Sequence, residues 1–202
     1  MNLFSVMVGR RTIRRFDQRP VDLGLLRQCV DVARLAPSAA NLQPFDYVLV
    51  AEPEGCSALF PALRWAAYLE PAWVPAECER PVAYIVMVAK SATSFTLRDM
   101  GLAAAHVVLL AESEGVGSCI LCDIDKEKIR AVLGIPEPFS ADAVIALGYK
   151  AEAPVVEERE DTVKYWRDAD GLLHVPKRPL SSVMHLESFK GTSASIRRKS
   201  KN

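Results

Sequence analysis

Four arginines and a threonine lie close together near the start of the chain, in the stretch Gly9-Arg10-Arg11-Thr12-Ile13-Arg14-Arg15-Phe16. Guanidinium groups this close repel one another unless an anion lies among them. Each guanidinium offers donors in a fixed geometry that suits phosphate oxygens, and the threonine hydroxyl adds one more donor. The stretch therefore indicates a site for a phosphate or another small anion. The alternative is a solvated basic surface at the end of a short helix.

A second polar stretch follows, Ala36-Pro37-Ser38-Ala39-Ala40-Asn41-Leu42-Gln43-Pro44. It is flanked by prolines and lies between a helical pattern and a strand pattern, which predicts a turn. Its hydroxyl and amide groups can contact the edge of a planar heterocycle. The alternative for Asn41 is that its side chain caps the turn itself.

In this order and at this spacing, the two stretches resemble the nitroreductase family of FMN-dependent oxidoreductases. The family pattern is Arg-Arg-Ser/Thr-x-Arg-x-Phe, a helix, and then Ala-Pro-Ser-x-x-Asn-x-Gln-Pro. The resemblance covers nearly the whole chain, because it continues through Asp99-Met100-Gly101-Leu102-Ala103, Gly115-Val116-Gly117-Ser118, Ala146-Leu147-Gly148-Tyr149 and Pro176-Lys177-Arg178-Pro179-Leu180. It implies an α+β fold with three layers, in which helices cover both faces of a mostly antiparallel central sheet. It also implies a homodimer in which each C-terminal tail wraps the partner subunit.

The resemblance further implies where FMN binds. One group of residues would hold the phosphate and the ribityl chain, with a basic pair closing on the phosphate from the opposite side. The residues of the first group are Arg10, Arg11, Thr12 and Arg14, and the basic pair is Lys177 and Arg178. The alternative for the basic pair is a solvated turn.

Two further groups would contact the flavin ring. The turn residues would line it from the partner subunit, and the end of a strand would present its backbone, with one N–H near N5. At this strand end the family often has an aromatic residue and a glycine, and this chain departs from that pattern. The turn residues are Pro37, Ser38, Ala39, Asn41 and Gln43, and the strand-end residues are Ile120, Leu121 and Cys122.

Three aromatic residues, Trp65, Tyr68 and Trp73, lie in the segment that roofs the active site in the family. We expect them to stack on the electron acceptor; the alternative is packing in the core. The histidines at 106, 174 and 185 belong to no recognisable acid–base arrangement. This fits a flavin-centred reaction that requires no catalytic acid or base from the protein.

The implied activity is a ping-pong oxidoreductase, in which NAD(P)H reduces FMN and an electron-poor acceptor such as a nitroaromatic or quinone then takes the electrons. One alternative keeps the fold and changes the flavin reaction, for example to dehalogenation or flavin conversion. Another is a non-catalytic flavin-binding module. No Rossmann glycine motif occurs, so the dinucleotide is expected to visit the flavin only transiently.

Composition excludes some classes of partner. The 202 residues hold 25 Lys and Arg against 25 Asp and Glu, which argues against a partner such as nucleic acid or an acidic membrane surface. No segment approaches the roughly 20 apolar residues of a membrane span. The pair Cys119 and Cys122 has no matching second pair, so no metal site is predicted, and we expect a cytoplasmic protein with reduced thiols.

Hydrophobic periodicity predicts the elements that position these residues. We expect one domain over residues 1–190 and a flexible tail over 191–202. From Glu152 onward the chain is charged and extended, and we expect this part to have no core of its own. The predicted helices span 3–9, 22–35, 58–69, 96–114 and 126–133, and the predicted strands span 46–51, 82–89, 118–122 and 141–147.

Overall fold

The structure is a computed structural model that describes residues 2–69, 72–90 and 93–189. The chain divides into two compact units, Met1–Ala153 and Pro154–Asn202, which are described separately below. The predicted flexible tail at 191–202 lies outside the described residues.

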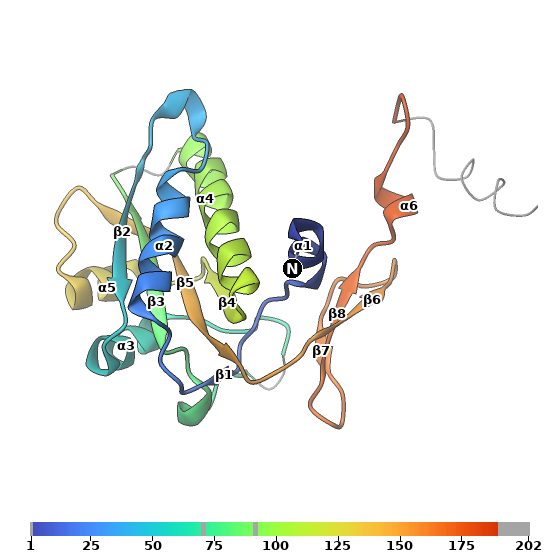
Figure 1. The fold of residues 1–202 in the computed structure, drawn as a ribbon, viewed down its shortest axis with the longest axis horizontal. Helices are drawn as coiled ribbons and strands as arrows, with labels where there is room; N and C mark the ends of the chain where they lie inside the picture. The colour runs from blue at the N-terminus through green and yellow to red at the C-terminus, as the bar shows by residue number, and fades with distance from the viewer. Residues whose placement is uncertain (1, 70–71, 91–92, 190–202) are drawn as a thin grey trace, which may run out of the picture. The chain divides into compact units, whose positions relative to one another are not determined.

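The first unit is built on a five-stranded sheet (Figure 1). Its strands follow the order β1-β5-β3-β2, and β4 also pairs with β5. Every pairing is antiparallel, which confirms the predicted mostly antiparallel sheet. The strands are β1 (Phe16–Asp17), β2 (Phe45–Val50), β3 (Ala83–Ala89), β4 (Val116–Leu121) and β5 (Ser140–Lys150).

Helices cover the sheet on both faces. All seven residues of β3 are buried, as predicted for an interior strand. Side chains alternate along a strand, and those of Ile85 and Ile145 belong to one core cluster with α2 (Leu23–Arg34) and α4 (Ser94–Ser113). The helix α5 (Lys126–Leu133) packs against β5 and α3 through residues outside that cluster. The predicted α+β class is therefore confirmed.

Local signals explain why most helices begin and end where the sequence predicts. The carboxylate of Asp22 accepts the backbone N–H of Leu25 at 2.9 Å and caps α2. Thr93 and Thr96 form a capping box at the start of α4. The helix α5 ends at Gly134, whose φ of 64° lies in the left-handed region that glycine adopts without strain. The predicted helix at residues 3–9 is also present, as α1 (Leu3–Gly9).

The helix predicted over 58–69 is wrong. The chain instead forms α3 (Pro53–Leu59), followed by the short 3-10 helix η2 (Phe60–Ala62). Pro53 suits the first turn of α3, because proline lacks a backbone N–H and the helix needs no N–H donor at that position. Pro61 has no N–H to continue the helix, and the chain leaves it as extended backbone at Leu63. The remaining short helices of the first unit are η1 (Ala39–Asn41) and η3 (Glu77–Glu79).

One helix departs from the expectation that no segment resembles a membrane span. Among the described residues, α4 alone is long and apolar enough to qualify by length and composition. However, Ala104, Val107 and Ala111 have no exposed surface, and the helix packs against α2 and β4. These are the properties of a core helix in a globular unit.

The second unit contains a three-stranded sheet in the order β6-β8-β7. The pair β6 and β8 is parallel and the pair β7 and β8 is antiparallel. Leu173 is almost fully buried, and the absence of a separate core in this part of the chain stays a prediction. Its strands are too short to show periodicity. The elements are β6 (Val155–Glu158), β7 (Trp166–Arg167), β8 (Leu173–Lys177) and α6 (Leu180–Val183).

Candidate functional site

The arginine-rich segment is fixed to the edge of the sheet beside β4. The backbone N–H of Ile13 donates to the carbonyl of Ser118 at 2.9 Å, and Thr12 forms a parallel bridge with the same residue. The Ile13 side chain is buried. Because successive side chains of an extended backbone point to opposite sides, the polar side chains next to Ile13 lie on the side opposite to it.

Three of the predicted site residues, Arg10, Thr12 and Ile120, line one cavity of about 360 Å³. The cavity has a cation and two hydroxyls on one part of its wall, and aliphatic side chains on the rest. Its remaining lining residues are Met7, Gly101, Ala105, Val108, Leu109 and Ser118.

Positive charge is incompletely neutralised at this cavity. No described side chain forms an ion pair with Arg10. Burial lowers the pKa of the Arg11 guanidinium, the charge of Arg10 lowers it further, and Glu112 partly offsets both. Glu112 is itself paired with Lys150, whose Nζ lies 2.6 Å from Oε1. A bound anion would therefore relieve the repulsion between the two adjacent arginines.

The next two arginines are held differently. The backbone N–H groups of Arg14 and Arg15 donate to Oε1 of Glu152 at 2.5 and 3.2 Å. The Arg15 side chain lies near Glu79 at 3.4 Å and over the ring of Trp73 at 5.9 Å. Glu152 thus holds the backbone at the C-terminal end of the segment. The Arg15 guanidinium interacts with other side chains of the fold.

The predicted turn is present, and its backbone is strained. Ala40, Asn41 and Gln43 have φ values of 49°, 55° and 47°, a region that residues with a Cβ rarely adopt. The N–H of Gln43 donates to Oγ of Ser38 at 3.0 Å and closes the turn. Strain of this kind persists only where the surrounding structure enforces it.

Asp99 on α4 enforces the turn from a distance in sequence. Both of its carboxylate oxygens accept the backbone N–H of Ala39, at 3.0 and 3.2 Å, and the side chain is 5% exposed. Asp99 belongs to one of the family-like segments of the sequence, where its residue type alone predicts no role. The available signal was an acidic residue at the start of a long apolar helix.

The turn borders a second cavity, of about 160 Å³. Pro37, Ser38 and Gln43 line it together with Asp99 and Ala103 of α4. The turn and the arginine segment therefore border different cavities of one chain. Both cavities share α4 as a wall.

The strand-end residues lie in three different environments. Ile120 is half-exposed in the first cavity, Leu121 is buried, and Cys122 is exposed just beyond β4. Burial raises the pKa of the Cys119 thiol to about 11, and burial together with the nearby Asp142 raises the pKa of Cys122. Both cysteines are free, and both are protonated at neutral pH.

The three aromatic candidates also differ in environment. Trp65 is buried and stacks on Phe60 with ring centroids 5.7 Å apart. This is packing in the core, the alternative to stacking on the acceptor. Tyr68 is half-exposed, and Trp73 is the residue beneath Arg15. Stacking of these residues on an acceptor stays a prediction.

The basic pair belongs to the second unit. Lys177 ends β8, and Nη2 of Arg178 donates to the carbonyl of Ser182 at 2.7 Å. Their contact with a phosphate stays a prediction.

Comparisons with known proteins agree on one family. A family model described as "Nitroreductase family" matches residues 7–149. An NADH dehydrogenase of Thermus thermophilus is 33% identical over 194 residues, which cover 81% of this chain and 95% of the relative.

Solved structures show the same fold. A nitroreductase family protein from Clostridium novyi NT has a TM-score of 0.63 at 25% identity, covering 88% of this chain and 94% of the other. An FMN-dependent nitroreductase from Clostridium difficile R20291 has a TM-score of 0.65 at 22% identity, covering 92% and 99%.

Proposed function

The chain belongs to the nitroreductase family and is an oxidoreductase; from that premise we propose that it carries electrons from NAD(P)H through bound FMN to an electron-poor small molecule. Curated relatives support the donor, since several of those that match over most of the chain are named NADH dehydrogenase or NAD(P)H nitroreductase, while one, at 23% identity, is named iodotyrosine deiodinase. We expect the electron acceptor to be a nitroaromatic or a quinone.

The cavity beside β4 is the observation that carries the FMN assignment. FMN has a doubly charged phosphate, a polyol chain and an apolar ring system. The cavity offers an arginine without an ion-pair partner among the described residues, two hydroxyls, and an aliphatic wall. The donors suit the phosphate and the polyol, and the aliphatic wall suits the ring, so these residues fit the cofactor.

Each residue then has a distinct role. FMN, when bound, supplies the chemistry of accepting and donating a hydride. Arg10 and Thr12 would hold the phosphate end, and contact of Lys177 and Arg178 with the phosphate stays a prediction. Ile120 and the aliphatic wall would exclude water from the ring. The backbone at the end of β4 would offer an N–H to the polar edge of the ring.

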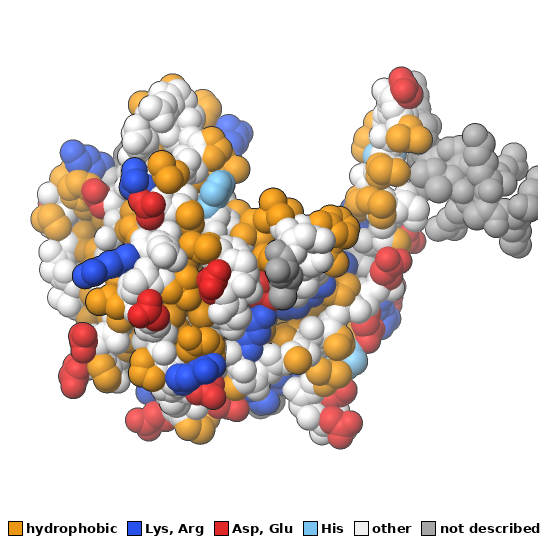
Figure 2. Space-filling view, in the orientation of Figure 1, with side chains coloured by type: hydrophobic (Ala, Val, Ile, Leu, Met, Phe, Trp, Pro, Cys, Tyr) orange, Lys and Arg blue, Asp and Glu red, His pale blue; other side chains and the backbone are white. Residues whose placement is uncertain are grey.

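The same proposal includes a homodimer. Several apolar side chains of α1 are strongly exposed, and Figure 2 shows hydrophobic side chains gathered over this helix. A patch of this kind indicates an interface. Since the turn and the arginine segment border different cavities, a partner's turn would complete the flavin site. The exposed residues are Leu3, Phe4, Met7 and Val8.

An anaerobic titration tests the function. Purified protein should be yellow, and NADH or NADPH without oxygen should bleach its flavin absorption. A later addition of a nitroaromatic or quinone should restore the absorption. Flavin that is bound but never bleached would reject the enzyme and favour a non-catalytic flavin-binding module. Protein that stays colourless after incubation with FMN would reject the cofactor assignment.

A further inference from the structure

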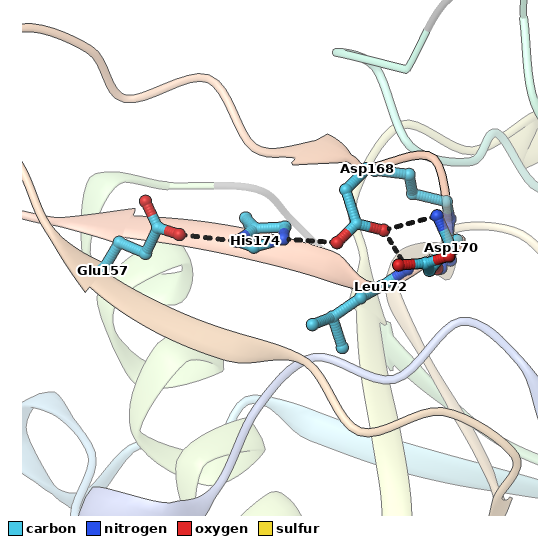
Figure 3. Close-up of polar contacts among 7 residues, drawn as sticks. Glu157, Asp168, Asp170, Leu172 and His174 are labelled. Carbon is cyan, nitrogen blue, oxygen red and sulfur yellow. Dashed lines mark hydrogen bonds and ion pairs between the residues drawn. The ribbon is translucent and has the colours of Figure 1, made fainter.

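His174 on β8 lies between two carboxylates, one on the neighbouring strand β6 and one directly after the neighbouring strand β7 (Figure 3). Its Nδ1 is 2.5 Å from Oε1 of Glu157, and its Nε2 is 3.0 Å from Oδ2 of Asp168. Glu157 belongs to β6, and Asp168 directly follows β7. One imidazole ring therefore joins all three strands of the second unit.

This arrangement requires a protonated ring. An imidazolium donates from both nitrogens, whereas a neutral imidazole donates from one and leaves a lone pair on the other. In the neutral state one nitrogen would thus face a carboxylate oxygen with no hydrogen between them. The hydrogen bonds to Asp168 and then to Glu157 accordingly raise the pKa of His174 above its ordinary value.

Other groups around the ring modulate this preference. The Trp166 ring on β7 stacks on His174 with centroids 4.9 Å apart and planes 7° apart, which favours the cation. Arg159, just beyond β6, lies 5.6 Å from the centre of Trp166, and Asp161 pairs with it at 2.6 Å. The positive charge of Arg159 is therefore largely offset.

Asp168 is held in place independently of the histidine. Its Oδ1 accepts the backbone N–H groups of Asp170 and Leu172 at 3.0 and 2.9 Å. These bonds form the turn between β7 and β8 and direct the other oxygen at His174 (Figure 3). The same bonds lower the pKa of Asp168, although the largest cause is its hydrogen bond to His174.

We propose that Glu157, His174 and Asp168 form a proton-dependent clamp that holds Lys177 in place and thereby makes FMN retention depend on pH. The proposal rests on the proposed function, in which Lys177 and Arg178 close on the phosphate. The link runs through the backbone. The N–H of Arg159 donates to the carbonyl of Lys177 at 2.9 Å, so Lys177 depends on the pairing of β6 with β8.

The sign of the effect follows from the two pKa shifts. Because the pKa of His174 is raised by folding, its stabilisation is complete below the ordinary value of 6.5 and is lost as pH rises through the folded pKa. Because the pKa of Asp168 is lowered, its contribution is complete above 3.8 and is lost as pH falls through its own folded pKa. The clamp is strongest between these limits and opens on the alkaline side.

Asp168→Asn provides a nearly isosteric test. Its Oδ1 can still accept the two backbone N–H groups, and its amide can donate to the Nε2 lone pair of a neutral ring, while Nδ1–H donates to Glu157. The variant should therefore keep the clamp closed at high pH. His185→Gln is the matched control, because Nδ1 of His185 has no hydrogen-bond partner among the described residues.

The experiment measures FMN affinity of the full chain from pH 5.5 to 8.5, with the His174 ring titrated by NMR. Wild type and the control should lose affinity as pH rises, by up to about tenfold for each unit by which closing of the clamp raises the pKa of His174. Asp168→Asn should lose much less. Titration of the FMN phosphate itself affects all variants equally and cancels in their ratio.

Two results would overturn the proposal. If FMN binds normally and Asp168→Asn follows the wild-type pH profile, the clamp has no role in retention. If His174 in the folded protein titrates at or below the ordinary histidine pKa, the proposed clamp is rejected, whatever the FMN measurements show. Lack of FMN binding at every pH would instead reject the proposed function, and the link to FMN with it.

Discussion

The Asp99 carboxylate accepts the backbone N–H of Ala39 with both of its oxygens, at 3.0 and 3.2 Å. The two residues lie far apart in sequence, and their contact fixes a turn that contains three non-glycine residues with positive φ. Each such residue costs on the order of 1–3 kcal/mol, which a free turn would release by rearranging. Asp99 is therefore a positioning residue for the turn.

Asp99→Ala should loosen this turn. We expect a loss of about 1–3 kcal/mol in the free energy of unfolding, because the N–H of Ala39 loses its partner. The variant should also hold FMN less tightly, since the turn is proposed to line the partner's flavin. Denaturant unfolding and FMN titration measure the two effects. Asp31→Ala removes an exposed carboxylate on α2 and should change neither; an Asp99→Ala protein equal to it would contradict the role.

Gly117→Ala should disturb the anchor of the arginine segment. A Cβ at this position would lie 2.8 Å from Cγ1 of Ile13 and 2.9 Å from Cγ of Lys150. Overpacking of this kind costs roughly 1–3 kcal/mol, and thermal unfolding should show it. Gly101→Ala is the control, because its Cβ meets nothing within 4 Å and a helical alanine is favoured. Equal melting temperatures for the two variants would contradict the packing constraint.

Tyr84→Phe should stabilise the protein. Tyr84 is fully buried on β3, and its hydroxyl has no hydrogen-bond partner among the described residues. A buried hydroxyl without a partner costs about 1–3 kcal/mol, so its removal should raise the free energy of unfolding by about 1 kcal/mol. Denaturant unfolding provides the measurement. A clear loss of stability would mean that the hydroxyl has a partner, such as a bound water.

The two cysteines near the end of β4 should be slow to alkylate at neutral pH. The pKa of Cys119 is about 11 and that of Cys122 is also raised, so both are thiols rather than thiolates at pH 7. The rate at the exposed Cys122 should rise with pH, and the buried Cys119 should react only after unfolding. Mass spectrometry after iodoacetamide treatment follows both sites. Fast labelling of Cys122 at pH 7 would contradict the raised pKa.

Local signals in the sequence were sufficient for much of the fold. The helix at 126–133 is found at its predicted bounds because an N-cap at Asp125 and a glycine at 134 mark its ends. No helix spans 58–69, because Pro61 has no N–H to continue one. The strands of the second unit are too short to be recognised by alternation.

Residue types also indicated part of the candidate site, whose binding of FMN stays a prediction. The arginine segment is a local pattern, and it borders a cavity as expected for an anion site. The roles of Asp99 and of the His174 cluster depend on contacts between residues distant in sequence. No spacing rule links Asp99 to Ala39 across 60 positions, or His174 to Glu157 across 17. Only the fold brings these groups together.

The most direct test of the central claim is the FMN dissociation constant of Arg10→Ala, measured beside Arg27→Ala, which removes an exposed arginine on α2. Loss of the proposed contact between Arg10 and the phosphate should weaken FMN binding by at least about tenfold, the equivalent of 1.4 kcal/mol. Arg27→Ala should bind as the wild type does. Equal, undiminished FMN affinity in both variants, each folded by circular dichroism, would contradict the assignment of this cavity to the cofactor.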